Sequence, residues 1–563
     1  MTLRLSFAQG ARRSTRLRGL ILFASLSIFS ASGCRHSHNT ISPTPPPAVS
    51  PTRFVDIAGA AGLKYRWIPP HRPNTILTAL GFGCAFLDYN NDGNLDILLV
   101  GPKLALYRGD GHGHFTDVTQ KMGLSNFSGK FIGCAVGDYD NDGFDDIYVS
   151  AYRGGMLLHN EGGEHFRDVT QKAGIKPQPW GTSCGFADLD NDGYLDLYVA
   201  NYIDFDSKTR PQFCGPPDAL RTCPPESYKG IKGTLYHNLG GKSFVDVTKA
   251  WGASAHSGKG LGEAFADFDG SGHVSLALAN DTVPGNLLKN TGMGMLKNVA
   301  ESAGIGYQKT GMPYGGMGID WGDYDNDGKL DLFVATFQDQ YKEVYHNIGN
   351  GLFEDVSKES GIGEPTATYV AFGCKFFDYD NDGWLDLIIA NGDVAGEHPH
   401  LPGWTYQQPT QLFHNPGRLP VVYEDVSNVS GPDLQRHIIG RGLAVGDFDN
   451  DGRVDVLIVD SSGSPLLLHN ESSPAGRWLS VRLTGTRGNR DGLGAVLTAT
   501  IGDRKLTRQC ETDGSYYSAS DRRVHFGVGA ARKVDSLSIR WPSGHIQVLR
   551  NIAVDQILNV RED

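Results

Sequence analysis

The sequence of 563 residues has neither a long apolar run nor an excess of basic residues. The apolar stretch from Leu20 to Phe29 is too short to cross a bilayer as a mature helix. Acidic residues outnumber basic ones by 63 to 51, which gives a formal net charge of -12. Nucleic acid and anionic membrane surfaces are therefore poor candidate partners.

The sequence also lacks the common motifs of catalytic and cofactor-binding sites. No H-E-x-x-H, P-loop or dinucleotide-binding motif occurs. Residues 181–185 match G-x-S-x-G, but Gly81–Cys84 occupies the same repeat position, and the motif leads into an acidic loop instead of a helix. Five histidines share a place before a repeated asparagine and are interpreted as structural: His159, His237, His346, His414 and His469. We assign no catalytic residue and favour a protein that is not an enzyme.

Cysteine is scarce, with 8 residues. Four share one repeat position ahead of an acidic loop: Cys84, Cys134, Cys184 and Cys374. They are expected to be buried thiols that lie apart in different blades. Cys214 and Cys223 lie close together in a proline-rich insertion, and in an exported protein they predict a disulfide. Cys510 is left as a free thiol.

A nine-residue acidic loop occurs seven times. Its copies begin at Asp88, Asp138, Asp188, Asp267, Asp323, Asp378 and Asp447. Side-chain oxygens stand at positions 1, 3, 5 and 9, and position 6 is always glycine, which allows the sharp turn that brings the position-7 carbonyl toward an ion. Calcium takes six to eight oxygen ligands, whereas magnesium demands a tighter octahedron. The loops therefore predict calcium.

Six loops keep at least three acidic positions and are predicted to bind Ca2+, about six sites in all. Their ligand positions are Asp88, Asn90, Asp92, Asn94, Asp96; Asp138, Asp140, Asp142, Phe144, Asp146; Asp188, Asp190, Asp192, Tyr194, Asp196; Asp323, Asp325, Asp327, Lys329, Asp331; Asp378, Asp380, Asp382, Trp384, Asp386; and Asp447, Asp449, Asp451, Arg453, Asp455. The fourth loop has Ser271 and Ser275 at positions 5 and 9, so Asp267, Asp269 and Ser271 form a weak or empty site.

The spacing of the loops predicts an all-β fold. The unit of roughly 50 residues, with two insertions, suits one propeller blade. A phrase resembling Phe-x-Asp-Val-Thr follows most loops, and one copy begins at Phe54, before the first loop. We expect that strand to close a ring beside the blade of Asp447, giving a seven-bladed β-propeller over 53–472. An open β-solenoid is the alternative.

Residues 473–563 predict a small β domain, here called the tail domain. Basic residues are frequent in it: Arg477, Arg482, Arg487, Arg490, Arg504, Lys505, Arg508, Arg522 and Arg523. They either form an anion-binding face or complement the acidic propeller.

These phrases carry a resemblance to known families. Residues 133–143, Gly-Cys-Ala-Val-Gly-Asp-Tyr-Asp-Asn-Asp-Gly, resemble the FG-GAP or VCBS repeat of integrin-α-type propellers. Residues 488–495, 525–529 and 541–544 resemble an ASPIC/UnbV domain. Together the two parts are similar to a bacterial member of the cartilage acidic protein family.

The N-terminus predicts export. Arginines precede the apolar run, and residues 31–34, Ala-Ser-Gly-Cys, resemble a bacterial lipobox. Residues 1–33 are interpreted as a lipoprotein signal peptide, Cys34 as the lipidated residue, and the Ser/Thr/Pro-rich 34–52 as a tether. An ordinary cleaved signal is the alternative. The lipid would attach the protein to the bacterial cell envelope and be its one contact with membrane.

Candidate ligand-binding residues lie in the insertion after the sixth loop: Glu397, His398, His400, Trp404 and Tyr406. Long loops on a rigid ring often carry binding residues. We expect a propeller that binds a protein or glycan and mediates adhesion. The alternatives are an enzyme or biosynthetic accessory factor, to which the UnbV resemblance points, and a purely structural envelope protein.

Overall fold

The computed structural model describes residues 53–68, 75–206, 208, 212–215, 221–254, 258–394, 405–473 and 475–563. The chain divides into the compact units Met1–Ala48 and Val49–Asp563, and all described residues belong to the second.

The propeller strands form four-stranded antiparallel units, here called blades 1 to 7 in the order of their loops, and blades 2 and 3 are joined into one eight-stranded sheet. Blade 1 is β2 (Cys84–Leu87), β3 (Asp96–Leu99), β4 (Ala105–Gly109) and β5 (Phe115–Asp117). Blade 2 is β6 (Phe131–Gly137), β7 (Asp146–Gly154), β8 (Met156–Asn160) and β9 (Phe166–Asp168). Blade 3 is β10 (Gln178–Ala187), β11 (Asp196–Asn201), β14 (Thr234–Asn238) and β15 (Phe244–Asp246). Blade 4 is β16 (Gly260–Ala266), β17 (Ser275–Asn280), β18 (Asn286–Asn290) and β19 (Leu296–Asn298).

The remaining blades follow the same order. Blade 5 is β20 (Gly316–Gly322), β21 (Asp331–Thr336), β22 (Glu343–Gly349) and β23 (Leu352–Asp355). Blade 6 is β24 (Ala371–Phe377), β25 (Asp386–Asn391), β26 (Gln411–His414) and β27 (Glu424–Asp425). Blade 7 is β28 (Gly440–Gly446), β29 (Asp455–Asp460), β30 (Leu466–Asn470) and the N-terminal β1 (Phe54–Asp56). Each acidic loop joins the first strand of its blade to the second.

The ring closes through β1. Phe54 pairs with Asn470 of β30, so the first strand of the chain completes the last blade, as the repeated phrase predicts. The first strands of the blades contact one another in the cycle β2, β6, β10, β16, β20, β24, β28 and back to β2. The fold is an all-β propeller, consistent with seven blades, and the open solenoid is wrong.

The inner strands pack closely because they contain glycine. A Cβ on Gly318 of β20 would lie 2.0 Å from the carbonyl oxygen of Phe372 in the next blade. The repeat-position cysteines are buried and free, as predicted. They do not all lie apart, however, because the Cys134 thiol donates to the carbonyl of Cys84 at 3.6 Å.

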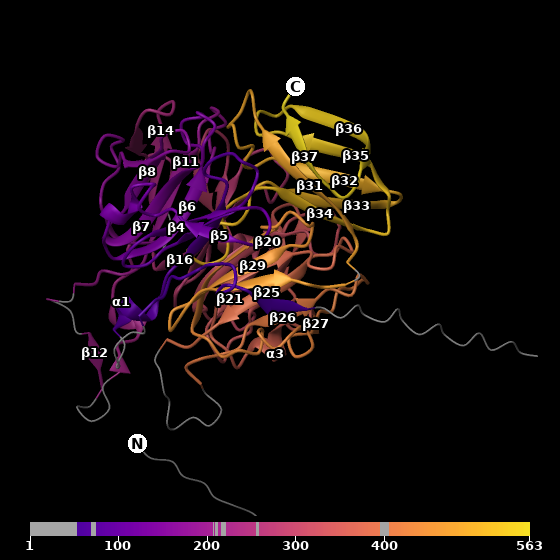
Figure 1. The fold of residues 1–563 in the computed structure, drawn as a ribbon. Helices are drawn as coiled ribbons and strands as arrows, with labels where there is room; N and C mark the ends of the chain where they lie inside the picture. Colours follow the sequence, from indigo (N-terminus) through magenta and orange to yellow (C-terminus); the bar gives the residue numbers. More distant parts are fainter. Residues whose placement is uncertain are drawn as a thin grey trace, which may run out of the picture. The chain divides into compact units, whose positions relative to one another are not determined.

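The tail domain forms two small sheets (Figure 1, yellow). One contains β31 (Arg477–Thr484), β34 (Val524–Gly529) and β37 (Gln556–Arg561). The other contains β32 (Val496–Ile501), β33 (Arg504–Gln509), β35 (Lys533–Arg540) and β36 (Ile546–Ala553). Sequence patterning did not predict β33 and β37.

Short helices, turns and one hairpin lie in the connections between the blade strands. They are α1 (Ile76–Ala79), α2 (Ala300–Ala303), α3 (Gly363–Thr366), the 3-10 turns Leu124–Asn126 and Pro225–Ser227, and the hairpin β12 (Phe213–Cys214) and β13 (Arg221–Thr222). The insertions 202–230 and 392–410 follow second strands of blades, so they leave the ring at the end opposite the acidic loops. We call these two ends the loop face and the insertion face.

Candidate functional site

The acidic loops bond their carboxylates to their own backbone. In the third loop, the two carboxylate oxygens of Asp188 accept hydrogen bonds from the amides of Asp192 at 3.1 Å and Gly193 at 3.0 Å. Asp196 accepts from the amide of Leu189 at 3.2 Å. The position-1 bonds recur in the first, second, sixth and seventh loops. The side-chain oxygens therefore converge inside each loop.

Several of these carboxylates keep a buried oxygen that has no hydrogen-bond partner among the described residues. The atoms are the Oδ1 oxygens of Asp140, Asp190, Asp380 and Asp449 at position 3, and Oδ1 of Asp323 at position 1. A buried carboxylate oxygen without a partner is costly, and coordination of a cation would satisfy it. The residues thus fit a hard cation.

Histidine joins the carboxylates of most loops. Ligand atoms of position 3, position 9 and the repeat histidine lie within 4.8 Å of one another in the groups Asp140, Asp146, His159; Asp190, Asp196, His237; Asp325, Asp331, His346; and Asp380, Asp386, His414. In the seventh loop the group is Asp449, Asp451 and His469. Several acidic and histidine groups could therefore hold a metal ion. The sequence predicts only a structural role for these histidines, and their fixed place before the repeat asparagine is the signal for their position beside the loops.

Burial and crowding raise the pKa values of the loop carboxyls. The pKa of Asp188 rises to about 8 because of burial and the charges of Asp196 and Asp192. Burial and neighbouring carboxylates likewise raise the pKa of Asp138 to about 9. Without a cation the carboxylates repel one another, and a divalent ion would relieve that repulsion.

A chain of asparagines connects consecutive loops. Position 4 is an asparagine with left-handed backbone in six loops, for example Asn141 at φ 60° and Asn381 at φ 61°. The Asn141 amide donates to the carbonyl of Gly193 in the next loop at 2.8 Å, and that of Asn381 to Gly452 at 2.8 Å. In the fourth loop Gly270 takes this position and has no side chain to continue the chain.

The fourth loop differs from the others in the basic side chains that contact its carboxylates. The repeat histidine is replaced by Lys289, whose ammonium lies 2.5 Å from Asp269. Arg540 of the tail domain pairs with Asp267. Protein cations therefore contact both remaining carboxylates of this loop.

The tail domain lies on the loop face. Arg482 contacts Asp88 at 3.0 Å, and Arg523 donates to the carbonyl of Asp447 at 2.6 Å. Other tail residues with basic side chains near the loops are Arg490, Arg504, Arg508 and Arg522. These side chains complement the acidic loops. Arg477 instead pairs inside the tail domain with Asp555.

Residues 510–523, between β33 and β34, form an axial segment along the inner strands of the ring. The amide of Cys134 donates to the carbonyl of Tyr517 at 3.0 Å, and that of Ile319 to the carbonyl of Ser515 at 3.0 Å. Both tyrosines of the segment are fully buried. The axial segment therefore joins blades on different sides of the ring.

The serine of the G-x-S-x-G match belongs to this packing. Ser183 is buried, and its hydroxyl accepts a hydrogen bond from the amide of Tyr517 at 3.1 Å. Ser183 thus positions the axial segment.

Comparison with protein families agrees with this architecture. An FG-GAP-like repeat model matches residues 88–149, 138–199, 267–334 and 323–389, and an ASPIC and UnbV model matches residues 485–563. The chain contains FG-GAP-like repeats followed by an ASPIC and UnbV domain. The fourth loop lies inside the third matched repeat, so the repeat is retained where two carboxylates are lost.

Curated relatives match the chain at modest identity. Cartilage acidic protein 1 of Xenopus tropicalis is 24% identical over 518 residues, covering 86% of this chain and 73% of the relative. The human protein of the same name is 24% identical over 369 residues, covering 55% of this chain and 54% of the relative. The chain spans about half the length of the human relative.

Among solved structures, a chain from work on recognition of non-reducing terminal N-acetylglucosamine by an Agrocybe aegerita lectin matches with a TM-score of 0.41 and 15% identity, covering 68% of this chain and 87% of that one. YCF48 bound to D1 peptide matches with a TM-score of 0.39 and 10% identity, covering 72% and 97%.

The FG-GAP propeller places the predicted ligand-binding insertion on the insertion face. Tyr406 is mostly buried, and its carbonyl accepts from the amide of Asp393 at 2.9 Å. Glu397, His398, His400 and Trp404 lie outside the described residues. Cys34 also lies outside them.

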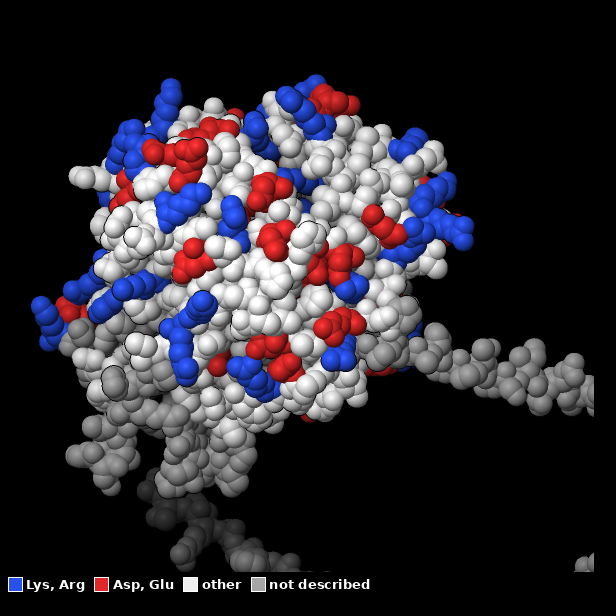
Figure 2. All heavy atoms as spheres, in the orientation of Figure 1, with Lys and Arg blue, Asp and Glu red and all other residues white. Residues whose placement is uncertain are grey.

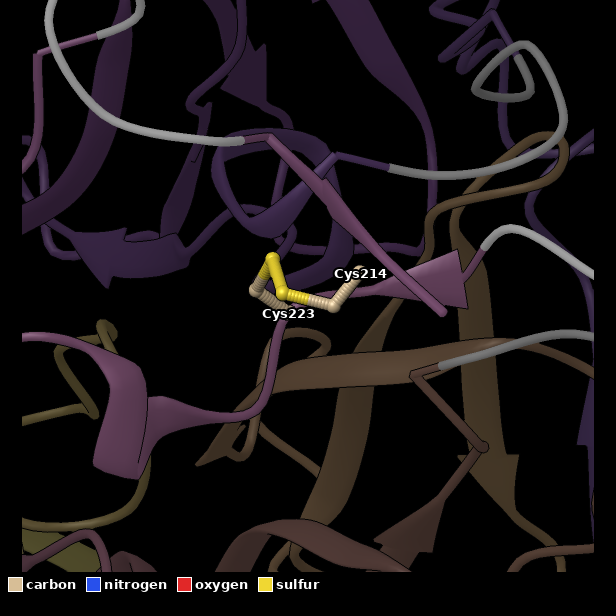
Figure 3. Close-up of a disulfide and its surroundings, with 2 residues drawn as sticks. All are labelled: Cys214 and Cys223. Atoms are coloured by element: carbon tan, nitrogen blue, oxygen red, sulfur yellow. A yellow bond between two sulfur atoms is a disulfide. The ribbon is translucent and has the colours of Figure 1, made fainter. Parts of the chain in front are cut away.

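A disulfide joins Cys214 to Cys223 in the other large insertion, with a Cα–Cα distance of 4.9 Å (Figure 3). Cys223 packs in a buried aromatic cluster with Trp180, Phe205 and Tyr228. The disulfide thus closes a loop within the insertion, and the packing of Cys223 holds that loop against Trp180 of blade 3. None of the helices in the described ranges is both long and apolar enough to span a bilayer.

Proposed function

We propose that this protein is an exported, calcium-loaded β-propeller that binds a protein or glycan through its insertion face and mediates adhesion. The observation that carries this proposal is the division of the ring into two unlike ends. The tail domain contacts the acidic loops on the loop face, while the insertions 202–230 and 392–410 follow second strands and so begin at the opposite end. The insertion face is therefore the end with room for a partner.

Calcium would be held by the carboxylates of six loops and would keep the ring closed around the axial segment. The orphaned buried oxygens of position 3 support this assignment, because calcium needs oxygen ligands. The fourth loop is excluded from the set by its protein cations. A site filled to ten times its dissociation constant adds about 1.4 kcal/mol to the free energy of unfolding.

The binding role is tested with the purified protein lacking residues 1–34, screened against glycan and protein arrays with and without calcium. We expect a ligand whose binding is lost when residues 395–404 are replaced by a Gly-Ser linker. A matched control replaces the exposed turn Glu161–Glu164 on the loop face, and it should bind normally. Absence of any ligand, or equal loss in both variants, would contradict the proposal.

Anchoring to the cell envelope is tested separately. Cys34→Ser should release the protein from bacterial membranes into the soluble fraction, because the lipidated cysteine is the proposed anchor. A Cys510→Ser variant serves as the control, since that buried thiol has no part in anchoring. Membrane retention of Cys34→Ser would reject the lipid anchor.

A further inference from the structure

The insertion face contains a groove whose charge is opposite to that of the whole chain. Its volume is about 1080 Å³, and it lies between residues 126–131, 151–156 and 168–177. The groove is lined by Lys130, Arg153, Lys172 and Lys176, with Asp168 as its one acidic side chain. The chain as a whole has a net charge of -12, and on the face drawn in Figure 2 the two signs are interspersed. Segregation of four cations in one groove is therefore a local feature that the composition does not predict.

The cations of the groove remain available to a ligand. Within the described part of the chain, no carboxylate lies within ion-pair distance of Lys130, Lys172 or Lys176. Lys130 has its ammonium 5.0 Å from the ring centre of Tyr152, which also lines the groove. Arg153 pairs with Asp206 at 2.9 Å and keeps 54% of its side chain exposed.

The backbone at Arg153 is held in an uncommon conformation. Its φ is 56°, in the left-handed region that a non-glycine residue enters at a cost. Its guanidinium also lies 5.5 Å from the Tyr152 ring centre, and Tyr152 donates to the carbonyl of Phe205 at 3.0 Å. These contacts position the guanidinium in the lining of the groove.

The groove offers charged and hydrogen-bonding groups, and most of its apolar lining residues are buried. Four of its apolar lining residues, Phe131, Ala151, Met156 and Ile175, are buried by the protein itself. The remaining lining combines hydroxyl, amide, glycine and basic groups and the carboxylate of Asp168 with two apolar residues, the half-buried Phe127 and the exposed Pro177. A peptide would need apolar pockets or a free strand edge as anchors, whereas an acidic saccharide is held by cations and hydrogen-bond donors.

We propose that this groove binds a segment of an acidic polysaccharide through its carboxylate or sulfate groups. The inference deepens the proposed binding function and rests on it. Because the ligand is held by exposed charges, its affinity should fall steeply with ionic strength.

The test uses two oligosaccharide hexamers, one of galacturonate and one sulfated, with neutral cellohexaose and hexaglutamate as comparisons. Binding is measured by calorimetry at 50 and 300 mM NaCl for the wild type and for the triple variant Lys130→Ala, Lys172→Ala, Lys176→Ala. We expect the wild type to bind at least one acidic hexamer, and the triple variant to bind it at least tenfold more weakly. The two hexamers distinguish carboxylate from sulfate as the recognised group.

The sequence supplies a matched control. Residues 117–121 and 168–172 have the same sequence, Asp-Val-Thr-Gln-Lys, but Lys121 lies outside the groove. The control variant Lys121→Ala, Lys249→Ala, Lys358→Ala changes three exposed lysines of equivalent repeat segments and should bind as the wild type does. Equal melting temperatures of both variants would show that the fold is intact.

Three outcomes would overturn this inference: no binding of either acidic hexamer, equal losses in the groove and control variants, or binding of hexaglutamate as tight as that of the hexamers. A ligand from the array screen that the triple variant still binds would leave the proposed function standing while rejecting the groove. If no array ligand depends on residues 395–404 while the wild type still binds an acidic hexamer, the role of that insertion is rejected and the groove stands.

Discussion

The ammonium of Lys289 lies 2.5 Å from a carboxylate oxygen of Asp269, at the repeat position where five other blades have histidine. This loop is also the one that has serine at positions 5 and 9. We predict about six calcium ions per chain by metal analysis of the purified protein. The triple change Ser271→Asp, Ser275→Asp, Lys289→His should add one ion, because it restores the ligand set and removes the competing ammonium.

The control for that count is Lys289→His alone, which leaves two carboxylates missing and should bind no additional ion. Seven ions in the wild type would contradict the interpretation of the fourth loop.

Removal of calcium should destabilise the propeller. Treatment with a chelator should lower the melting temperature, since each filled site contributes about 1.4 kcal/mol at ten times its dissociation constant. Calcium should restore the transition, and magnesium at equal concentration should restore less of it. A melting temperature unchanged by chelation would exclude a structural role for the ion.

Asn326 tests the hydrogen bonds between loops. Its amide donates to the carbonyl of Gly383 at 3.1 Å, and its φ is 57°. Asn326→Gly keeps the backbone accessible and loses the bond, so it should cost about 0.5–1.5 kcal/mol. Asn326→Ala loses the same bond and should lower the free energy of unfolding by a further amount of about 1–2 kcal/mol, because alanine is strained in the left-handed conformation. Chemical denaturation in saturating calcium measures both, and an alanine variant as stable as the glycine variant would contradict the strain.

Gly83 tests the axial segment. A Cβ at this residue would lie 1.8 Å from the carbonyl oxygen of Tyr517, so Gly83→Ala must displace the segment. We expect a loss of about 1–3 kcal/mol in the free energy of unfolding and faster proteolysis of the tail domain. Gly59→Ala is the matched control, because a Cβ there meets nothing within 4 Å. Equal proteolysis rates would show that the segment does not hold the tail domain.

A buried charge cluster predicts a pH dependence. The Lys375 ammonium contacts Asp320 at 2.5 Å and Glu511 at 3.0 Å. Burial lowers the pKa of Lys375, but these carboxylates outweigh it and raise that pKa. Asp513, beside them and near Glu263, has its pKa raised by burial and the charge of Glu511 from 3.8 to about 8.

The sign of the effect follows from the raised pKa. The folded state holds the Asp513 proton up to about pH 8 and the unfolded state only to about pH 4, so stability from this group falls as pH rises between those values. The slope is at most about 1.4 kcal/mol per pH unit. Denaturation at pH 5, 6.5 and 8 in saturating calcium should show it, and Asp513→Asn should flatten it. Exposed Asp503→Asn is the control, and an unchanged slope in Asp513→Asn would refute the assignment.

Sequence reasoning succeeded where a contact is encoded locally. The positions of Asp188 and Gly193 predict the turn, and a repeated phrase at Phe54 predicts the closing strand. Both follow from short patterns that recur along the chain.

Sequence patterns did not predict contacts between residues that are far apart in the chain. Asn141 bonds to a loop 52 residues away, so its role is visible only when loops are stacked round the ring. The sequence shows Lys289 at the position of the repeat histidine, but only the structure shows that its ammonium pairs with Asp269. The axial segment has no periodic pattern, and its partner Cys134 is 383 residues from Tyr517.

The pairing of Phe54 with Asn470 also sets an order of events during synthesis. The first strand of the chain has no partner until more than 400 residues later, and the axial segment emerges later still. Contacts so distant in sequence are slow to form. A folding chain must therefore keep its leading strand from pairing wrongly until the residues of β30 are available to it.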